Sequence, residues 1–445
     1  MSPSALSSRV SVASFPAAVR RGARRARAFR ASPPRASAAA ADAAPDVPST
    51  KRVVILGGGI QACSIAYYLS KRGVPSTIVE RTAIAAAASG KSGGFLAGGW
   101  GDGGVTQTLH RESFALHASL AEELQLRTYR KIPTLSVAGG PALSDQRPPV
   151  SWLDGDVARA ELMDDATAQV TPSELTARLH EEAMRVPGAE TIIAEAVGVV
   201  RARDPDDPDP DSNPRVVGVE VRDDDTGEIT VIPADVCVVA MGPWSTRASE
   251  WFDVDVPMTG VKSVSLVYDA SSAVAKEPAA LFCAEDANGC HLEVYPRSTG
   301  EVYVCGCGGS EYVDESRLLP GGDLDRAERV SPDSSRVAAA SASFAGLSAS
   351  VGAGGPKKTQ SCMRPCPPDA LPILGGVPGT DGAYMCCGHN CWGILWAPVS
   401  GKIVSELVVD GRSSVNLAPF SPGRFMTRAQ KRGKKMRDVN VGEQW

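Results

Sequence analysis

Residues 51–81 carry the most regular pattern of apolar and polar positions in the chain. The β-branched run at 52–56 predicts a short strand, and three consecutive glycines at 57–59 end it. Apolar residues then recur at helical spacing over 60–72, and residues 76–79 predict a second strand. The stretch therefore predicts a strand, a glycine turn, a helix and another strand, in that order.

The pattern after this stretch alternates between helical and extended segments. Residues 234–240 form an apolar run typical of a buried parallel strand. Residues 256–310 predict an antiparallel sheet, and 331–355 are Ala/Ser-rich and predict a weak helix followed by a loop. Further helices are expected at 110–125, 171–184 and 402–409, and further strands at 131–137, 191–201, 215–222, 228–233, 261–268, 291–295 and 301–305.

Length and composition indicate a soluble protein of two domains. At 445 residues the chain exceeds the size at which one hydrophobic core stops growing, so we expect two domains, interleaved in sequence. A hydrophobic content of 43% with 22% charged residues is that of a globular protein. Because no apolar run approaches the length that spans a bilayer, no membrane span is expected.

The first 41 residues differ in composition from the rest. They contain eight Arg, no Lys and no acidic residue, and they are rich in Ser, Ala and Pro. This composition predicts an organellar transit peptide, for a chloroplast rather than a mitochondrion, although a disordered tail without a targeting role has the same composition. Without them the chain has 38 basic and 51 acidic residues, a net charge of −13, which argues against a nucleic-acid partner. The basic cluster at 428–437 is expected to be a solvated tail.

The glycine turn has the spacing of a dinucleotide-binding fingerprint, G-x-G-x-x-A. Gly57 makes the tight turn, Gly59 lets the backbone approach a diphosphate, and Ala62 keeps the helix close to the strand. Glu80 follows 23 positions after Gly57, where a carboxylate can bind ribose hydroxyls. An ordinary strand–turn–helix is the alternative, but the flanking strands and the terminal Glu favour dinucleotide binding.

Two further glycine-rich segments follow the fingerprint. The loop 89–104 and the turn at Gly242-Pro243-Trp244 each suggest backbone folded closely over a ligand, although a flexible surface loop is the alternative for the first. The eleven cysteines include no C-x-x-C pair and no Cys/His spacing suited to zinc, so no metal site is expected.

Four separated motifs together resemble the D-amino-acid oxidase/glycine oxidase/sarcosine oxidase (DAO) family of flavoproteins. The resemblance covers about residues 50–415. The motifs are the segment 57–80, the loop 89–95, the run Ala-Met-Gly-Pro-Trp-Ser at 240–245, and the late pair of segments 364–375 and 388–401.

This resemblance implies an α/β (α+β) two-domain fold that binds FAD. A Rossmann-like FAD-binding domain would be assembled from the discontinuous segments 49–130, 170–250 and 358–415. An antiparallel-sheet substrate domain would comprise 131–169 and 251–357, between a disordered leader at 1–48 and a basic tail at 416–445. The resemblance implies a flavin-dependent oxidation of the C–N bond of a small amine or amino acid, with dioxygen or an electron-transfer partner as acceptor.

The resemblance also assigns individual residues. To FAD it assigns Gly57, Gly59, Ile60, Gln61, Glu80, Arg81, Ser89, Gly90, Lys91, Gly93, Gly94, Val197, Gly242, Trp244, Cys362, Gly388, His389, Gly393, Ile394 and Leu395. To the substrate end it assigns Arg364, Lys91 and Tyr295.

Each substrate-end assignment has a structural alternative. Arg364 lies where glycine oxidases place a carboxylate-binding arginine, but it can equally be a structural residue paired with Asp369. The chain has Cys391 where those enzymes carry a second arginine, which argues against a simple amino-acid substrate. Lys91 can be an exposed loop lysine, and Tyr295 a structural residue at the end of a hairpin with Arg297.

Cys362 and His389 have less certain roles than the glycines. Cys362 has the spacing of the cysteine that tethers FAD in sarcosine oxidases, Cys-Met-x-x-x-x-Pro-Asp, but a buried inert thiol is favoured. His389 is expected to belong to a rigid loop rather than to act as a base.

Two other functions fit the sequence. A flavoprotein without turnover, acting in assembly or trafficking, would keep FAD but would not be reduced by amines. An NAD(P)-linked dehydrogenase would be colourless, but it would not need its C-terminal segments to return to the dinucleotide.

Overall fold

The structure is a computed structural model that describes residues 51–141, 147–206, 208–209 and 212–426. Contacts within the chain group these residues into one compact unit. The transit peptide expected in residues 1–41 and the basic cluster at 428–437 lie outside the described residues.

A six-stranded, mainly parallel sheet contains the glycine turn, as expected from the fingerprint. Strand β1 (Val53–Leu56) lies at its centre, between β10 (Val236–Val239) and β2 (Ser76–Glu80). Both neighbours are parallel to β1, with Val53 opposite Val236 on one side and Ser76 on the other. The order is completed by β17 (Ile373–Gly376) and β18 (Ala383–Cys387) beyond β10, and by β6 (Glu190–Ile193) beyond β2.

Alternate residues of the central strands enter two different cores. Val53 and Ile55 pack with helices α1 (Ile60–Ser70), α3 (Gln107–Glu123), α4 (Pro172–Ala183) and α10 (Gly393–Asp410). Val54 and Leu56 pack against α5 (Ala248–Phe252) and the three-stranded sheet of β7 (Glu195–Ala202), β8 (Arg215–Arg222) and β9 (Ile229–Pro233). Because both faces are covered, the strands are continuously apolar rather than alternating.

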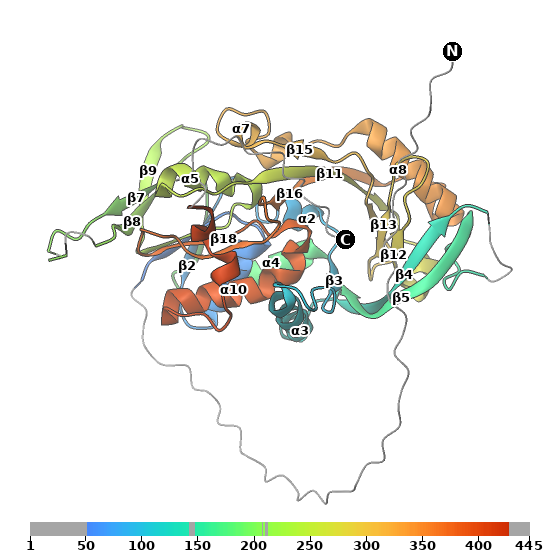
Figure 1. The fold of residues 1–445 in the computed structure, drawn as a ribbon, viewed down its shortest axis with the longest axis horizontal. Helices are drawn as coiled ribbons and strands as arrows, with labels where there is room; N and C mark the ends of the chain where they lie inside the picture. The colour runs from blue at the N-terminus through green and yellow to red at the C-terminus, as the bar shows by residue number, and fades with distance from the viewer. Residues whose placement is uncertain (1–50, 142–146, 207, 210–211, 427–445) are drawn as a thin grey trace, which may run out of the picture. The chain divides into compact units, whose positions relative to one another are not determined.

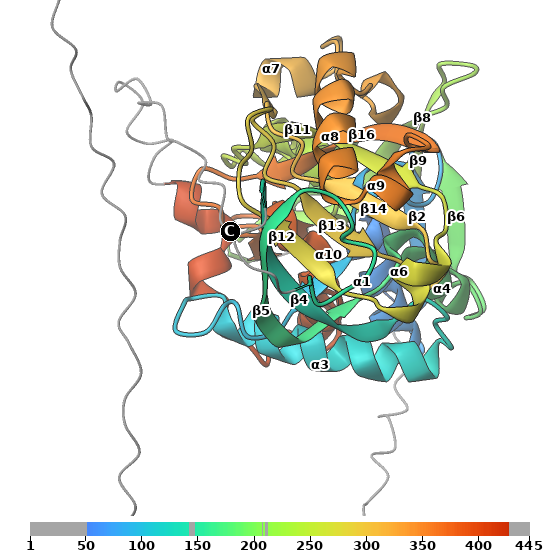
Figure 2. The same ribbon diagram turned by 90° about the vertical axis from the view of Figure 1, so that its right-hand side faces the viewer.

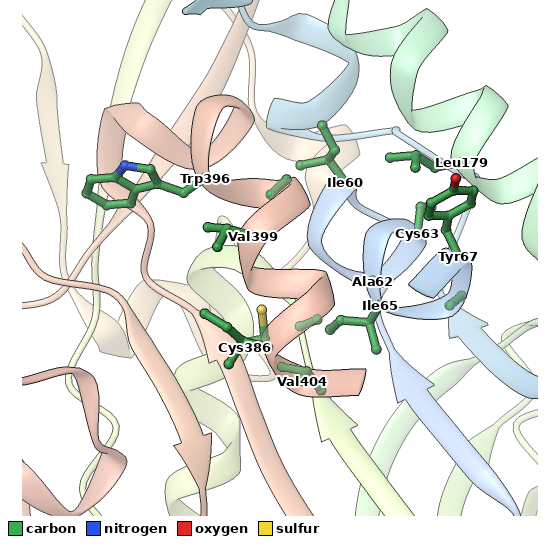
Figure 3. Close-up of a cluster of buried hydrophobic side chains, with 14 of the residues drawn as sticks. Ile60, Ala62, Cys63, Ile65, Tyr67, Leu179, Cys386, Trp396, Val399 and Val404 are labelled. Carbon is green, nitrogen blue, oxygen red and sulfur yellow. The ribbon is translucent and has the colours of Figure 1, made fainter. Parts of the chain in front are cut away.

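Helices α1 and α10 pack together closely enough that small residues are required between them (Figure 3). A Cβ on Gly401 would lie 2.3 Å from the Ser64 hydroxyl oxygen of α1. That hydroxyl donates to the carbonyl oxygen of Ala397 at 2.9 Å. The joint brings the N-terminus of α10, which is more than 300 residues later in the chain, beside the fingerprint helix.

Pro398 interrupts the hydrogen bonds of α10, and α3 replaces them. Because proline has no N–H, the carbonyl of Ile394 loses its intrahelical donor, and the Val399 N–H donates instead to Ser113 of α3 at 3.1 Å. His117 of α3 donates from Nε2 to the carbonyls of Ile394 (3.0 Å) and Leu395 (3.1 Å). Figure 1 shows α3 beside α10. Two buried polar side chains, Ser113 and His117, thus bond to the backbone groups near Pro398 that have no partner within the helix.

A second, nine-stranded sheet forms the other half of the unit (Figures 1 and 2). One face packs on α8 (Ser334–Leu347) through residues such as Val294, Val304 and Phe344. Within the described residues its strand pairs are antiparallel, except that β12 is parallel to β4. Its strands are β3 (Phe95–Ala97), β4 (Arg130–Gly139), β5 (Val157–Gln169), β11 (Thr259–Tyr268), β12 (Ala280–Cys283), β13 (Glu293–Pro296), β14 (Val302–Cys305), β15 (Glu311–Val313) and β16 (Lys358–Cys366).

The remaining elements are short helices that connect the sheets. They are α2 (Ala88–Lys91), α6 (Ser272–Lys276), α7 (Glu315–Leu318), α9 (Ala349–Gly352), and the 3₁₀ helices η1 (Gly242–Arg247), η2 (Ala327–Arg329), η3 (Asn390–Trp392), η4 (Ala418–Phe420) and η5 (Pro422–Phe425).

The α/β two-domain fold class is confirmed, and four elements differ from the expectation in their bounds, their strength or their presence. Residues 191–201 are not one strand, because Ala194 ends β6 in one sheet before Glu195 begins β7 in another. The strand β5 was missed because its apolar Leu162 and Met163 are exposed whereas its polar Thr167 and Gln169 are buried, so no alternating pattern marks it. The last helix begins at Gly393 rather than at residue 402, since the polar contacts from α3 sustain it through Pro398. The segment 331–355 holds a full helix, α8, which Asp333 caps by accepting from the N–H groups of Ser335 and Arg336.

Among the described residues one helical segment, Asn390–Asp410, is long and apolar enough to cross a membrane by length and composition. Two thirds of it (67%) is buried inside the protein, because α10 is packed between α1 and α3. Burial of this kind is that of a core helix.

Candidate active site

A cavity of about 350 Å³ extends from the glycine turn of the six-stranded sheet to the inner face of the nine-stranded sheet. Its two ends differ in chemistry. Backbone, glycine and charged side chains line the end near β1, and aromatic rings line the end near β13 and β14.

The turn after β1 is held in a conformation that glycine permits. Gly57 has φ +104°, and a Cβ at this position would lie 2.6 Å from the Ala240 carbonyl oxygen at the end of β10. Ser89 accepts from the Ile60 N–H at 2.9 Å, and the first intrahelical bond runs from Cys63 to Gly59. The first N–H groups of α1 therefore point out of the helix end beside the cavity, where they suit an anion.

Glu80 is fixed at the end of β2 by backbone donors. The Gly58 N–H donates to Oε2 at 2.6 Å, and the Thr82 N–H donates to Oε1 at 3.0 Å. Its carboxylate is thus oriented at the cavity wall before any ligand binds, next to the glycine turn.

Beside Glu80, three arginines converge on the buried carboxylate of Glu195. Arg81 approaches to 3.0 Å, Arg247 to 2.9 Å and Arg222 to 3.4 Å. Arg81 and Arg247 also line the cavity. This network holds two guanidinium groups at the cavity wall with their positions set by Glu195.

Six aromatic side chains surround the far end. The rings of Phe95 and Tyr295 are stacked with centroids 5.2 Å apart, and Trp100 packs edge-on against Phe95 at 5.3 Å. The six are contributed by five strands or loops and by η3, namely Phe95, Trp100, Phe282, Tyr295, Tyr303 and Trp392. The wall is therefore built from segments that are far apart in sequence.

Glu293 and Cys305 extend this wall on the neighbouring strands β13 and β14, where they are register partners. Oε2 of Glu293 accepts hydrogen bonds from the Tyr295 hydroxyl and from the Cys305 thiol, the latter at 3.7 Å. Burial raises the pKa of Tyr295 well above its ordinary value, and the Glu293 charge raises it further. Tyr295 is therefore a neutral hydrogen-bond donor.

Strand β16 brings Cys362 and Arg364 to the cavity from the other side of β11. The Asp369 carboxylate, the alternative partner considered for Arg364, accepts from Arg424 at 2.8 and 3.2 Å. Burial raises the pKa of the Cys362 thiol, and the nearby Lys91 and Arg364 charges lower it in part. Cys362 is consequently a neutral thiol at this wall.

His389 lies in the cavity wall, immediately before η3. Its Nε2 lies 3.0 Å from the Ser400 hydroxyl of α10, and burial lowers its pKa to about 3. The imidazole is therefore neutral at pH 7, and the expectation that His389 is not a base stays a prediction.

Most residues assigned from the sequence lie together in this cavity. Those that line it are Gly57, Gly59, Ile60, Gln61, Glu80, Arg81, Ser89, Gly93, Gly94, Gly242, Trp244, Tyr295, Cys362, Arg364, Gly388, His389, Gly393 and Ile394.

Four assigned residues lie outside the cavity lining. Leu395 is buried among α1, α3 and α10, and Val197 follows the lining residues Ala194–Ala196 on β7. Gly90 lies inside α2, where an added Cβ would lie 2.2 Å from the Ala85 carbonyl oxygen. Lys91 donates from Nζ to the Ser361 carbonyl at 3.2 Å, which ties α2 to β16 behind Cys362.

Sequence reasoning missed Glu293, the aromatic wall beyond Tyr295, and the Glu195 cluster. The signal for the first two was present in β13 and β14, where Glu293, Tyr295, Tyr303 and Cys305 alternate with valines. No local sequence pattern indicates the Glu195 cluster, because the three arginines around Glu195 come from three different elements.

The cavity fits FAD by its shape and by its donor groups. The helix N-terminus and the side-chain-free turn at Gly57 suit a diphosphate, and the preset Glu80 carboxylate suits ribose hydroxyls. The connected aromatic end leaves room for a flat ring system and a small substrate. In the described part of the chain, no group of three or more His, Cys, Asp or Glu side chains is arranged to hold a metal ion.

Comparison with known proteins gives a consistent result. The sequence profile of the DAO family, described as FAD dependent oxidoreductase, matches residues 52–407. The chain is 26% identical over 410 residues to a Schizosaccharomyces pombe protein named as an oxidoreductase, covering 84% of this chain and 98% of that protein. It is 25% identical over 401 residues to a glycine oxidase of Geobacillus kaustophilus, covering 84% and 97% respectively.

Solved structures share the fold at lower identity. The crystal structure of glycine oxidase from Geobacillus kaustophilus superposes with a TM-score of 0.63 at 21% identity, covering 84% of this chain and 99% of that one. L-proline dehydrogenase from P. horikoshii gives a TM-score of 0.65 at 17% identity, covering 86% and 99%.

Proposed function

The chain belongs to the DAO family of FAD-dependent oxidoreductases, and we propose that it oxidises the C–N bond of a small amine or amino acid. The observation that carries this proposal is the single cavity that joins the dinucleotide turn to the aromatic wall. A cofactor anchored at Glu80 and Gly57 can extend from there to a substrate held at Tyr295.

The flavin, when bound, supplies the chemistry by accepting a hydride from the substrate carbon next to nitrogen. The protein's own residues bind the cofactor and orient the substrate. The N–H groups at the start of α1 bind the diphosphate, and Glu80 accepts hydrogen bonds from the ribose. The aromatic wall excludes water and leaves the substrate few orientations.

At the substrate end we propose that Arg364 binds a carboxylate. Its guanidinium offers paired donors that match two carboxylate oxygens, and the DAO motif places it at the substrate. Tyr295 lies in the aromatic wall as a neutral hydrogen-bond donor, and its hydroxyl donates to Glu293.

The test is anaerobic mixing of the FAD-loaded protein with glycine, sarcosine, D-alanine, L-proline and ethylamine, followed by flavin absorbance. We expect bleaching of the flavin by at least one of them. A flavin that stays oxidised with every member of a wider amine panel would contradict the proposal and favour a flavoprotein without turnover.

Arg364→Lys gives a more specific readout. It should raise the half-saturating concentration of the carboxylate-bearing amines and leave that of ethylamine unchanged, because lysine cannot bind a carboxylate through two parallel N–H groups. Arg297→Lys is the matched control, since Arg297 lies outside the cavity and pairs with Glu301.

We further propose dioxygen as the electron acceptor, with hydrogen peroxide as product. The family resemblance supports this proposal. Measurement of peroxide formed per substrate consumed tests it, and a ratio near zero in air with continued turnover through an artificial acceptor would contradict it.

The composition of residues 1–41 supports a location in the chloroplast. Import of the full-length chain into isolated chloroplasts, compared with a chain that starts at residue 49, tests this proposal. Uptake by mitochondria instead would contradict it.

A further inference from the structure

Residues 319–330, which join α7 to α8, form a strap along the cavity wall. The middle of the strap lines the cavity through four consecutive residues, Asp325, Arg326, Ala327 and Glu328. Leu324 and Val330 flank these four and are buried with Met363 of β16 in a small hydrophobic cluster. The Trp244 indole N–H of η1 also donates to the Leu324 carbonyl at 2.9 Å. The strap is thus anchored on both sides of its cavity-lining part.

Short hydrogen bonds within the strap and to α7 fix its shape. The Leu324 N–H donates to the Arg317 carbonyl of α7 at 3.1 Å. The Arg317 guanidinium donates to both oxygens of Asp323, at 2.8 and 2.7 Å. Arg329 donates from Nη1 to the Gly322 carbonyl at 3.0 Å. The strap therefore keeps its own conformation without contacts from the six-stranded sheet.

The middle of the strap reaches the dinucleotide end of the cavity through longer ion pairs. Nη1 of Arg326 lies 3.8 Å from Oδ2 of Asp224, in the turn between β8 and β9. The same oxygen lies 3.6 Å from Nε of Arg81, the residue that follows Glu80. Arg81 lines the cavity and is paired with Glu195 at 3.0 Å. Asp224 therefore links the strap to the arginine beside Glu80.

The ion pair and the anchors should break at different cost. The side chains of Arg326 and Asp224 are 33% and 39% exposed, so water and salt screen their attraction. Leu324 and Val330 are buried, and their apolar contacts are not screened. Arg326 can therefore leave Asp224 while the two ends of the strap stay in place.

We propose that the strap covers the dinucleotide part of bound FAD and that the Arg326–Asp224 pair is a latch that slows the release of FAD. The latch keeps residues 325–328 over the cavity end beside Arg81 and so retains the cofactor without a covalent bond. The inference concerns retention of the cofactor and not the oxidation of a substrate, so it goes beyond the proposed function. Arg326 is in this sense a positioning residue, which acts by holding the strap closed.

The rate of FAD release tests the latch directly. The protein is loaded with radiolabelled FAD, and its exchange for an excess of unlabelled FAD is followed without substrate. Arg326→Gln and Asp224→Asn should each release FAD about two- to fivefold faster than the wild type, because a partly exposed ion pair contributes a factor of about this size. Arg326→Lys keeps the charge and should stay close to the wild-type rate. Asp323→Asn is the matched control, since Asp323 pairs with Arg317 and does not line the cavity.

Two further readouts separate a latch from a general loss of stability. In the Asp224→Asn background, Arg326→Gln should add little to the release rate, because the pair is already broken. Raising sodium chloride from about 0.05 to about 0.5 M should speed release more in the wild type than in either variant, because salt can screen the pair only where it is present. A variant that merely destabilised the fold would change neither relation.

Wild-type release rates in folded Arg326→Gln and Asp224→Asn overturn the inference. So do single effects that multiply in the double variant, or an equal salt dependence in all the proteins. Labelled FAD that never exchanges from the wild type also overturns it, because a covalent bond would then retain the cofactor. Failure of the proposed oxidation is a separate result, since release is measured without substrate. If no amine reduces the flavin but release depends on the Arg326–Asp224 pair, the latch stands and the reaction falls.

Discussion

The two ends of the cavity are built in different ways. The dinucleotide end is made mostly of backbone from one continuous stretch, in which Gly57, Gly59 and Glu80 are set by β1, α1 and β2. The aromatic end is made of side chains from at least five separate elements, among them β3, β12 and η3. The residues that bind the dinucleotide are close together in the sequence. The residues that select a substrate come from segments that are far apart in the sequence.

This difference has a physical cause. A diphosphate is recognised by N–H groups and by the absence of side chains, and both are properties of a local turn. An amine of particular shape is recognised by a surface on several sides, which only distant segments can provide. The two ends should therefore respond differently to substitutions of similar size.

The largest effect is expected from Gly57→Ala at the dinucleotide end. The added Cβ would lie 2.6 Å from the Ala240 carbonyl, at φ +104°, so the turn or β10 must move. We expect a loss of about 4 kcal/mol or more in the free energy of unfolding, together with loss of bound flavin. Chemical denaturation and flavin absorbance per protein measure the two effects.

Gly73→Ala is the control for Gly57→Ala, because it has φ +70° but no atom within 4 Å of the added Cβ. It should cost only about 1–2 kcal/mol and keep its flavin. Equal losses in the two variants would show that backbone conformation, and not the close approach to Ala240, controls the turn.

Acidification should destabilise the packing of α3 against α10, where His117 is buried. Burial lowers the pKa of His117 to about 4, below its ordinary value of 6.5. Between these values the unfolded chain binds a proton that the folded protein does not, so stability falls as pH decreases from 6.5 to 4. Protonation of His117 alone should lower the free energy of unfolding by up to about 3 kcal/mol at the acid end of this range.

His117→Gln can still donate to the carbonyls of Ile394 and Leu395 but does not titrate. Its free energy of unfolding should decrease less steeply from pH 6.5 to 4 than that of the wild type. His180→Gln, which removes a half-buried histidine bonded to Thr191, should change the slope less. An unchanged slope in His117→Gln would show that the buried imidazole is not what couples α3 to α10 in acid.

Gly93→Ala tests the aromatic end by overpacking. The new methyl group would lie 2.3 Å from Cδ2 of Tyr295 and 2.8 Å from Cε1 of Tyr303. We expect a loss of about 1–3 kcal/mol in stability and a higher half-saturating concentration of the amine that reduces the flavin, with a smaller loss of FAD than in Gly57→Ala. A loss of FAD as large as that in Gly57→Ala would mean that the two ends are not independent.

The smallest effect is expected at Cys362. Because burial raises the pKa of this thiol, the reactive thiolate is disfavoured, and we expect no covalent bond to flavin. After acid precipitation the flavin should remain in the supernatant, and Cys362→Ser should bind as much FAD as the wild type. Yellow colour that stays with the precipitated wild type, but not with Cys362→Ser, would establish a tether.

The sequence by itself determined the dinucleotide end of this protein. The strand, turn, helix and second strand at 52–80 formed as expected, and Glu80 lies at the turn, because hydrogen bonds and hydrophobic spacing over a few residues decide these features. The α/β two-domain fold followed from the same pattern together with the family motifs. Cofactor residues of the late segments, such as Gly388 and His389, were found through those motifs alone.

Only the tertiary structure decided the rest. It divided residues 190–202 between two sheets. It also extended α10 back through Pro398, because Ser113 and His117 supply the missing hydrogen bonds from 277 or more residues away. It also placed Glu293 beside Phe282 and Cys305, which lie on two other strands and reach it only by strand pairing. Local backbone geometry is encoded in adjacent residues, whereas the burial and pairing of a charge depend on which distant segments surround it.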